Sequence, residues 1–264
     1  PAPPPPVASP IPPRTVPAIG SATPPPNLKI SSRDLQVLEF ILEMKFASID
    51  EVFERFFSRT RLNEPAKSNI YAFERLDLLE KHGFLKVVFP FSENKKYYLT
   101  TEKAYLTLNQ LIELDKLPRP VNSIDQRIFL HDKLVLKARV EFEKRHPEGK
   151  WISDRRLRAG VAAMFGLPSA MIPDGIYELP SGERVAFELE NARKGKSAYE
   201  EKITFFVKLI RMRKDDPQMF TRVSYRCVHE EIANKLREMT SMYGDMFTVD
   251  VWRPSDVELP ESPR

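Results

Sequence analysis

The chain has 264 residues and a formal net charge of +4, from 41 basic and 37 acidic side chains. Hydrophobic residues make up 42% of it and aromatic residues 10%, which is ordinary for a globular protein and too much for a disordered one. The small net charge excludes a protein coated in positive charge, such as a histone. Any contact with nucleic acid must therefore come from local clusters of basic side chains.

The first 26 residues contain twelve prolines and a single charge, Arg14. Proline lacks an amide donor and fixes φ, so this stretch cannot form a helix or a sheet ladder. Residues 1–28 are predicted to be a disordered, polyproline-rich tail. A spacer is favoured over a ligand for an aromatic groove on a partner. Residues 254–264 are predicted to be a second disordered tail.

Localisation is predicted to be cytoplasmic. The N-terminal stretch lacks the basic start and apolar core of a secretory signal. No apolar run approaches the roughly 18 to 20 residues that a membrane-spanning helix needs, so no membrane partner is expected. The single cysteine, Cys227, has no disulfide partner, which fits a reducing compartment and makes a structural zinc site unlikely.

Residues 30–115 are predicted to begin with three helices. Ser31 precedes an apolar pattern of helical spacing, which predicts a helix over 32–45. Ser48 and Glu51 have capping-box spacing, which predicts a second helix after Ser48. A third helix is predicted over 65–81, ended by Gly83. The side chains expected to point inward from this third helix are Ile70, Phe73, Leu76 and Leu79, with Leu78 as a further candidate.

Two short runs rich in β-branched and aromatic residues follow, at 84–89 and 95–99, across a polar turn. They predict a β-hairpin. A fourth helix is predicted over 101–114. Three helices, a hairpin and a helix are the order of a winged helix-turn-helix.

In such a domain the third helix enters the major groove of DNA and the hairpin tip touches the adjacent backbone. The predicted DNA-contacting residues are Arg59, Arg61, Lys67, Ser68, Asn69, Tyr71, Arg75, Lys95 and Lys96. Residues 28–100 carry twelve basic and eleven acidic side chains, so the region is nearly neutral. Because winged helices also dock proteins, a protein-docking role remains an alternative.

Residues 123–253 predict a second, α/β region. The expected order is a helix over 124–145, three strands, a helix, a strand, a helix and a final strand. The expected strands and later helices are 151–153, 176–179, 184–191, 197–214, 221–228, 230–243 and 247–252. This order predicts a mixed sheet and a restriction-endonuclease-like core. The fold class of the whole chain is therefore predicted to be α+β.

Carboxylates mark a candidate site in this region. Along residues 184–191, strand alternation places Glu188 and Glu190 on one face. Two such carboxylates repel each other unless a cation lies between them. Asp174 could join Glu188 across the hairpin, and Mg²⁺ prefers oxygen ligands of this kind. Two alternatives remain, since Pro-Asp-Gly is a common turn and both glutamates could face solvent.

Three other features of this region are ambiguous. Residues 191–214 carry eight basic side chains against two acidic ones. A second basic cluster consists of Lys150, Arg155, Arg156 and Arg158. Such clusters fit either phosphate binding or a solvated helix face. His131, beside Asp132, is interpreted as a hydrogen-bonded structural histidine rather than a catalytic base.

Pro173-Asp174 followed by Glu188-Leu189-Glu190 resembles the P-D…(D/E)-x-K nuclease superfamily. The resemblance implies that Asp174 and Glu188 bind Mg²⁺ and that a lysine positions water or stabilises charge. This chain carries Glu190 where the superfamily has that lysine. Some members supply the lysine from the following helix, where Lys202 lies; Lys194 and Lys196 are looser substitutes. The catalytic set implied is Asp174, Glu188, Glu190 and Lys202.

Residues 31–215 also resemble the replication-relaxation family of bacterial plasmids and other mobile elements. The features that carry the resemblance are Arg33-Asp34-Leu35, Arg75-Leu76, Gly83-Phe84-Leu85, Tyr97-Tyr98-Leu99-Thr100, His131-Asp132-Lys133-Leu134-Val135 and the two acidic motifs. The resemblance implies DNA handling in replication, relaxation or transfer.

Three functions follow. The first is a protein that binds double-stranded DNA, the second a Mg²⁺-dependent DNA nuclease or nickase, and the third a scaffold for replication or transfer proteins. A homodimer remains open.

Overall fold

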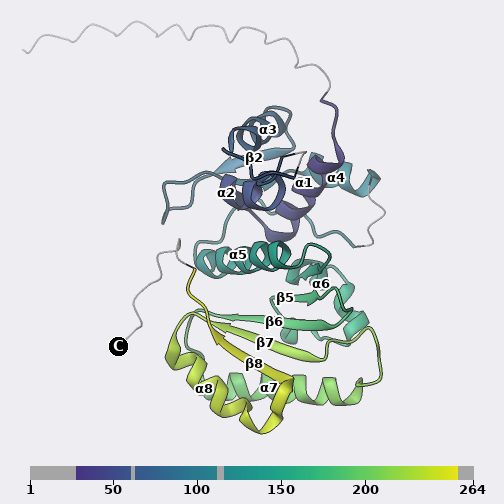
Figure 1. Ribbon diagram of the computed structural model, residues 1–264, viewed down its shortest axis with the longest axis vertical. Coiled ribbons are helices and arrows are strands. Elements are labelled where there is room, and N and C mark those ends of the chain that lie inside the picture. Colours follow the sequence, from purple (N-terminus) through teal and green to yellow (C-terminus); the bar gives the residue numbers. More distant parts are fainter. Residues whose placement is uncertain (1–27, 61–62, 112–115, 255–264) are drawn as a thin grey trace, which may run out of the picture.

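The computed structural model describes residues 28–60, 63–111 and 116–254 and has an α+β fold. A small antiparallel sheet lies in the N-terminal part and a mixed five-stranded sheet in the C-terminal part. The helix α5 (Phe129–Arg145) lies between the two parts (Figure 1). No helix in the described ranges is long and apolar enough to cross a membrane.

The N-terminal part places three helices, a hairpin and a fourth helix in the predicted order. Its elements are α1 (Ser32–Met44), β1 (Ala47–Ser48), α2 (Ile49–Val52) with a π-helical turn (Phe53–Phe57), α3 (Ile70–Lys81), β2 (Leu85–Val88), β3 (Tyr97–Thr100) and α4 (Glu102–Leu111). The three strands pair antiparallel in the order β1-β3-β2. Strand β1 was not predicted, because two residues carry too little periodicity to register as a strand.

Local signals explain where these helices begin and end. Ser31 and Asp34 form a capping box at α1, and Ser48 and Glu51 form one at α2. Each box satisfies amide groups that the first turn leaves without partners. Gly83 follows α3 with φ of 73°, a left-handed conformation that costs glycine little. These predicted caps are confirmed.

The predicted start of the third helix is wrong, and its predicted inward face is right at Leu76 and Leu79 but wrong at Ile70 and Phe73. The helix begins at Ile70 rather than near Pro65, so Ser68 and Asn69 precede it. Ile70 and Phe73 are 53% and 47% exposed, whereas Ala72, Leu76 and Leu79 are buried. The buried three are spaced four and three residues apart, which is one helical stripe. Ile70 and Phe73 lie off that stripe.

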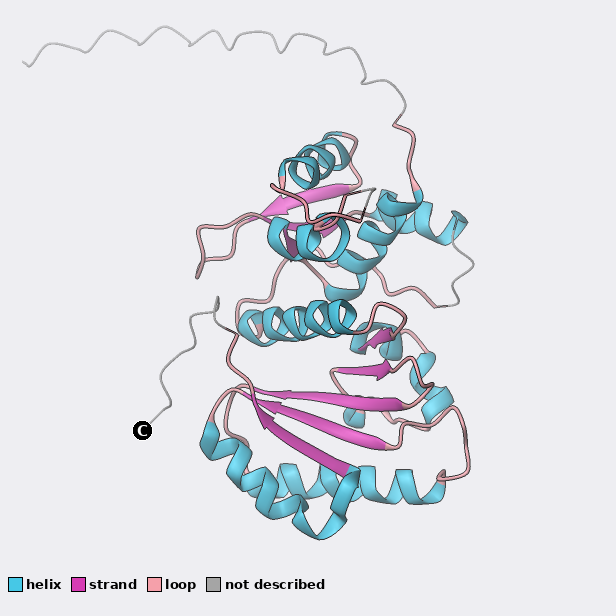
Figure 2. Ribbon diagram, viewed as in Figure 1, coloured by secondary structure: helices cyan, strands magenta, loops and turns pink. Residues whose placement is uncertain are grey.

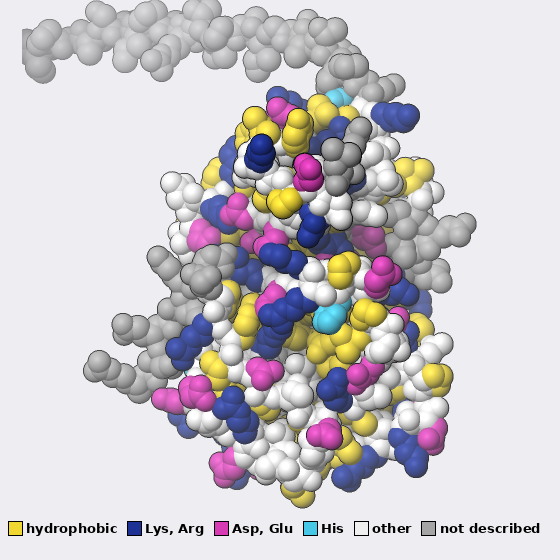
Figure 3. All heavy atoms as spheres, viewed as in Figure 1, with side chains coloured by type: hydrophobic (Ala, Val, Ile, Leu, Met, Phe, Trp, Pro, Cys, Tyr) yellow, Lys and Arg dark blue, Asp and Glu magenta, His cyan; other side chains and the backbone are white. Residues whose placement is uncertain are grey.

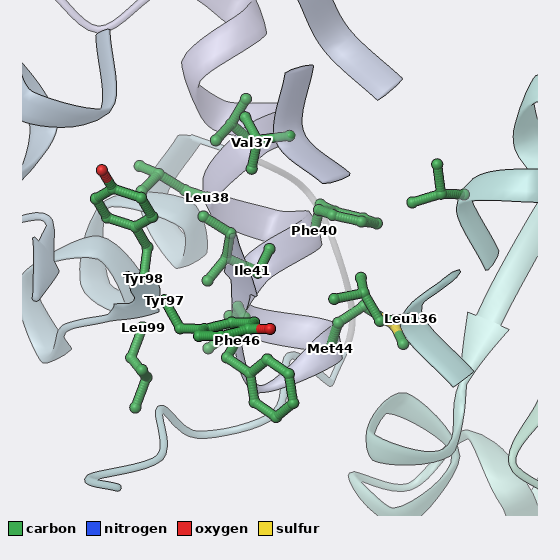
Figure 4. Close-up of a cluster of buried hydrophobic side chains, with 14 of the residues drawn as sticks. Val37, Leu38, Phe40, Ile41, Met44, Phe46, Tyr97, Tyr98, Leu99 and Leu136 are labelled. Atoms are coloured by element: carbon green, nitrogen blue, oxygen red, sulfur yellow. The ribbon is translucent and has the colours of Figure 1, made fainter. Parts of the chain in front are cut away.

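The core of the N-terminal part continues into α5. Figure 4 shows side chains of α1 and β3 packed together, with Phe46 among them. The rings of Phe46 and Tyr97 meet edge to face at 5.4 Å, and Phe129 of α5 lies 5.2 Å from Phe46. The predicted helix over 124–145 begins only at Phe129. Asp125 instead accepts a hydrogen bond from the amide of Arg127 in the preceding turn.

The C-terminal part contains β4 (Lys150–Ser153), α6 (Asp154–Arg158), β5 (Gly175–Glu178), β6 (Arg184–Glu190), α7 (Lys196–Met212), β7 (Arg222–Cys227), α8 (Glu230–Thr240) and β8 (Phe247–Val251). The sheet order is β4-β5-β6-β7-β8. Strands β4 to β6 are antiparallel, and β6, β7 and β8 are parallel. The predicted element order and the mixed sheet are confirmed; α6 was not predicted.

Helices cover both faces of the five-stranded sheet (Figure 2). Helix α5 packs on one face, and α7 and α8 pack on the other (Figure 1). Strand β6 alternates between them: Phe187 and Leu189 join the core shared with α5, whereas Ala186 joins the core beneath α7. Glu188 and Glu190 therefore face α7.

Candidate nucleic-acid interface and carboxylate cluster

An open groove of about 1060 Å³ lies in the N-terminal part, between α3 and the start of α1. The start of α1, residues 59, 60 and 64–68, and α3 form its walls. Five of the nine predicted DNA-contacting residues line it: Arg59, Lys67, Ser68, Tyr71 and Arg75. These residues and the start of α1 share one surface, which we call the α3 groove.

The guanidinium of Arg75 is held in an ion pair. Its Nε donates to Asp34 Oδ1 at 2.6 Å, and its Nη2 donates to the carbonyl of Lys29 at 3.1 Å. Burial raises the pKa of Asp34, but the hydrogen bonds from Arg75 and Ser31 outweigh this effect and hold the pKa below its usual value. Arg75 therefore joins α3 to α1 and to the chain before α1, rather than extending freely toward a ligand.

The remaining charges of the α3 groove are mixed in sign. Arg59 donates to the carbonyl of Asn63 at 2.9 Å, within its own loop. Lys67 is exposed, and Tyr71 is 74% exposed. Glu64 and Glu74 also line the groove. Figure 3 shows hydrophobic, basic and acidic side chains interspersed over the N-terminal part.

Three other predicted DNA-contacting residues, Asn69, Lys95 and Lys96, lie outside the lining of the α3 groove. Lys95 pairs with Asp50, with Nζ and Oδ2 2.6 Å apart. Lys96 is exposed beside it, and Asn69 is exposed just before α3. Arg61 lies outside the described residues.

The carboxylates predicted in the C-terminal part do converge. Glu188 and Glu190 are each 1% exposed, so the expectation that they could face solvent is wrong. Lys202 of α7 places its Nζ 2.6 Å and 2.8 Å from the two carboxylate oxygens of Glu188. Lys194 Nζ lies 2.8 Å from Glu190 Oε1. The predicted partnership of Lys202 with the β6 carboxylates is thus seen as a contact.

Asp174, just before β5, completes this carboxylate cluster. Its Oδ2 accepts a hydrogen bond from the amide of Leu189 at 2.8 Å. His131 of α5 lies against the same oxygen, with Nε2 3.3 Å away, and its Nδ1 is 3.6 Å from Asp132. Burial lowers the pKa of His131, but the two aspartates outweigh it and raise the pKa to about 10. The sequence indicated Asp132 as a neighbour of His131, because the two are adjacent in the chain. It did not indicate the contact between His131 and Asp174.

The protonation of the cluster follows from its burial. Burial raises the pKa of Glu188 to about 7, although Lys202 acts to lower it. Burial likewise raises the pKa of Glu190 against the opposing effect of Lys194. Tyr199, whose hydroxyl lies 3.4 Å from Glu190 Oε2, was not predicted as a neighbour.

The observed arrangement does not fit a bound Mg²⁺ ion. Within the described residues, no group of three or more His, Cys, Asp or Glu side chains could hold a metal ion. Each acidic member already has a cationic partner: Asp174 has His131, Glu188 has Lys202 and Glu190 has Lys194. Such pairing offsets the cost of burying the carboxylates without an added ion. A cavity of about 20 Å³ beside Asp174 and His131 has room for about one water molecule.

The second predicted basic cluster is not a free surface patch. Arg155 donates to the carbonyls of Leu42 and Arg119, and Arg156 pairs with Glu43 and Glu39. These contacts join α6 to α1 and to the linker before α5. The phosphate-binding interpretation of these two arginines is therefore wrong. Lys208, Arg211 and Lys214 remain exposed at the C-terminal end of α7.

The chain was compared with protein-family models, curated proteins and solved structures, and none of the three comparisons gives a match.

Proposed function

We propose that the chain is a DNA-binding protein in which residues 30–115 act as a winged helix-turn-helix and the α3 groove faces duplex DNA. The observation that carries the proposal is the convergence of five predicted contact residues around one groove. The element order and the β1-β3-β2 sheet agree with a winged helix, with β2 and β3 as the wing. The resemblance to the replication-relaxation family suggests plasmid or other mobile-element DNA.

The contacts divide by chemistry. Arg59 and Lys67 would bind phosphates, which position the protein on the duplex. Tyr71 and Ser68, which also line the groove, would contact sugars or base edges. Lys96, exposed at the wing, would touch the adjacent backbone. Because Arg75 and Lys95 are already paired, few cations are free, and a shallow salt dependence is expected.

Binding to a fluorescent DNA duplex, measured by anisotropy across a salt series, tests the proposal. Lys67→Glu should weaken binding about tenfold and reduce the salt slope by about 1 for the lost phosphate contact. Lys208→Glu makes the same charge change on α7 and should leave binding unchanged. Equal weakening by both variants would show that net charge, not the α3 groove, drives binding.

A nuclease is the second candidate, because Asp174, Glu188 and Lys202 are brought together from three different elements. It has less support, since each carboxylate is already paired and the set does not fit a bound metal ion as arranged. Incubation with supercoiled plasmid and Mg²⁺ or Mn²⁺ tests it. Nicking by the wild type that is lost in Asp174→Asn would establish the nuclease; intact plasmid with both proteins would exclude it.

A further inference from the structure

The α3 groove has a lining suited to an extended, proline-rich peptide. Tyr71 presents its ring to solvent at 74% exposure, and Phe57 and Leu78 contribute further apolar surface. Arg59 and Lys67 supply donors at the edge of the groove. Grooves lined by aromatic side chains bind polyproline segments, whose exposed carbonyls accept hydrogen bonds and whose preformed helix loses little entropy.

The chain itself delivers such a segment to this place. The carbonyl of Lys29 accepts a hydrogen bond from Arg75 of α3, and Leu28 and Ile30 pack against the core. Ser31, Ser32 and Arg33 then line the α3 groove. Everything before Leu28 is thus tethered at the wall of the groove.

Residues 1–27 have the composition that the groove would select. They contain twelve prolines, ten of them in clusters at residues 3–6, 10–13 and 24–26, and one charged side chain, Arg14. An uncharged segment fits a groove in which acidic and basic side chains are mixed. At about 3.1 Å per residue in a polyproline helix, 27 residues span roughly 80 Å, so several clusters can reach the groove.

We propose that residues 1–27 bind back into the α3 groove of their own chain through a proline cluster. The docking is inferred from the lining of the groove and from the attachment of Lys29 to its wall. The effect on DNA affinity rests in addition on the proposed function. A tethered segment has an effective concentration of about 1 mM, so even an affinity of about 100 µM fills roughly nine-tenths of the grooves. Since DNA then competes for the remaining tenth, its apparent Kd rises about tenfold.

Photo-crosslinking in the full chain tests the docking without DNA. A benzoylphenylalanine replaces Tyr71 in one protein and Phe91 in the control, since Phe91 is 99% exposed and outside the groove lining. After irradiation of dilute protein, digestion and mass spectrometry, position 71 should be linked to residues 1–27 of the same chain and position 91 should not. No link from position 71 to the tail, or links only between two copies, would overturn the proposal.

A second measurement separates this proposal from the proposed function. Serine replaces all twelve prolines of residues 1–27 in the full chain, which leaves its charge unchanged. We expect this variant to lose the crosslink from position 71 and to bind duplex DNA about tenfold more tightly than the wild type. A retained crosslink in the serine variant would show that the prolines are not the ligand. A crosslink in wild type without DNA binding by either protein would refute the DNA function and leave the docking intact.

Discussion

The α3 groove and the carboxylate cluster beneath α7 were both expected to be charged functional sites, and they differ in burial. Around the groove, Arg59 and Lys67 border open space and Tyr71 is exposed. In the cluster, Glu188 and Glu190 are 1% exposed and each contacts a lysine. Charged side chains are therefore available to a partner molecule at the α3 groove, whereas those of the carboxylate cluster are paired within the protein.

The cause of the difference is the cost of burying charge. An unpaired buried carboxylate costs several kcal/mol, so Glu188 is stable there only with Lys202 or with a proton. A charge that remains in water has no such cost and needs no partner. Burial therefore decides which charges can contact another molecule.

The largest expected effect comes from removing the cation of the cluster. Lys202→Met leaves Glu188 buried and unpaired, and should lower the free energy of unfolding by about 3–5 kcal/mol near pH 8. Urea unfolding followed by circular dichroism measures it. Adding Glu188→Gln to that variant should restore most of the loss. Lys196→Met, which breaks an exposed pair with Glu200, should change stability by less than about 1 kcal/mol. A loss that small for Lys202→Met would mean that water reaches Glu188.

A pH dependence of intermediate size should come from Glu188. Its pKa rises from 4.5 to about 7 on folding, so the folded state holds a proton that the unfolded state releases. The resulting stability is fully present below pH 4.5 and is lost as the pH rises through about 7, a change of about 3 kcal/mol. The free energy of unfolding of the wild type and of Glu188→Gln, measured between pH 4.5 and about 8, isolates the contribution of Glu188. Parallel curves for the two proteins would contradict the raised pKa.

The smallest effect is expected on the exposed face of α3. Phe73→Ala should change the free energy of unfolding by no more than about 0.5 kcal/mol, because the side chain is 47% exposed. Leu76→Ala, three residues along the same helix, removes a buried side chain and should cost about 2–5 kcal/mol. Thermal unfolding compares them. Similar losses from both would place Phe73 in the core, as helical periodicity alone had suggested.

Local chemistry made much of the fold predictable from the sequence. Ser31 and Ser48 cap helices through residues three positions away, and Gly83 ends α3 through its own φ. The alternation along β6 correctly placed Glu188 and Glu190 on one face. Such features depend only on neighbours within a few residues along the chain, so they can be predicted from a sequence pattern.

Only the tertiary structure decided which charged side chains are available. Arg75 pairs with Asp34, 41 residues away, and Arg156 pairs with Glu43, 113 residues away. His131 meets Asp174 only because α5 packs on the sheet beside β5. The sequence determined where charge and helical periodicity occur. Chain folding determined which charges were buried, and the cost of burial then selected their partners.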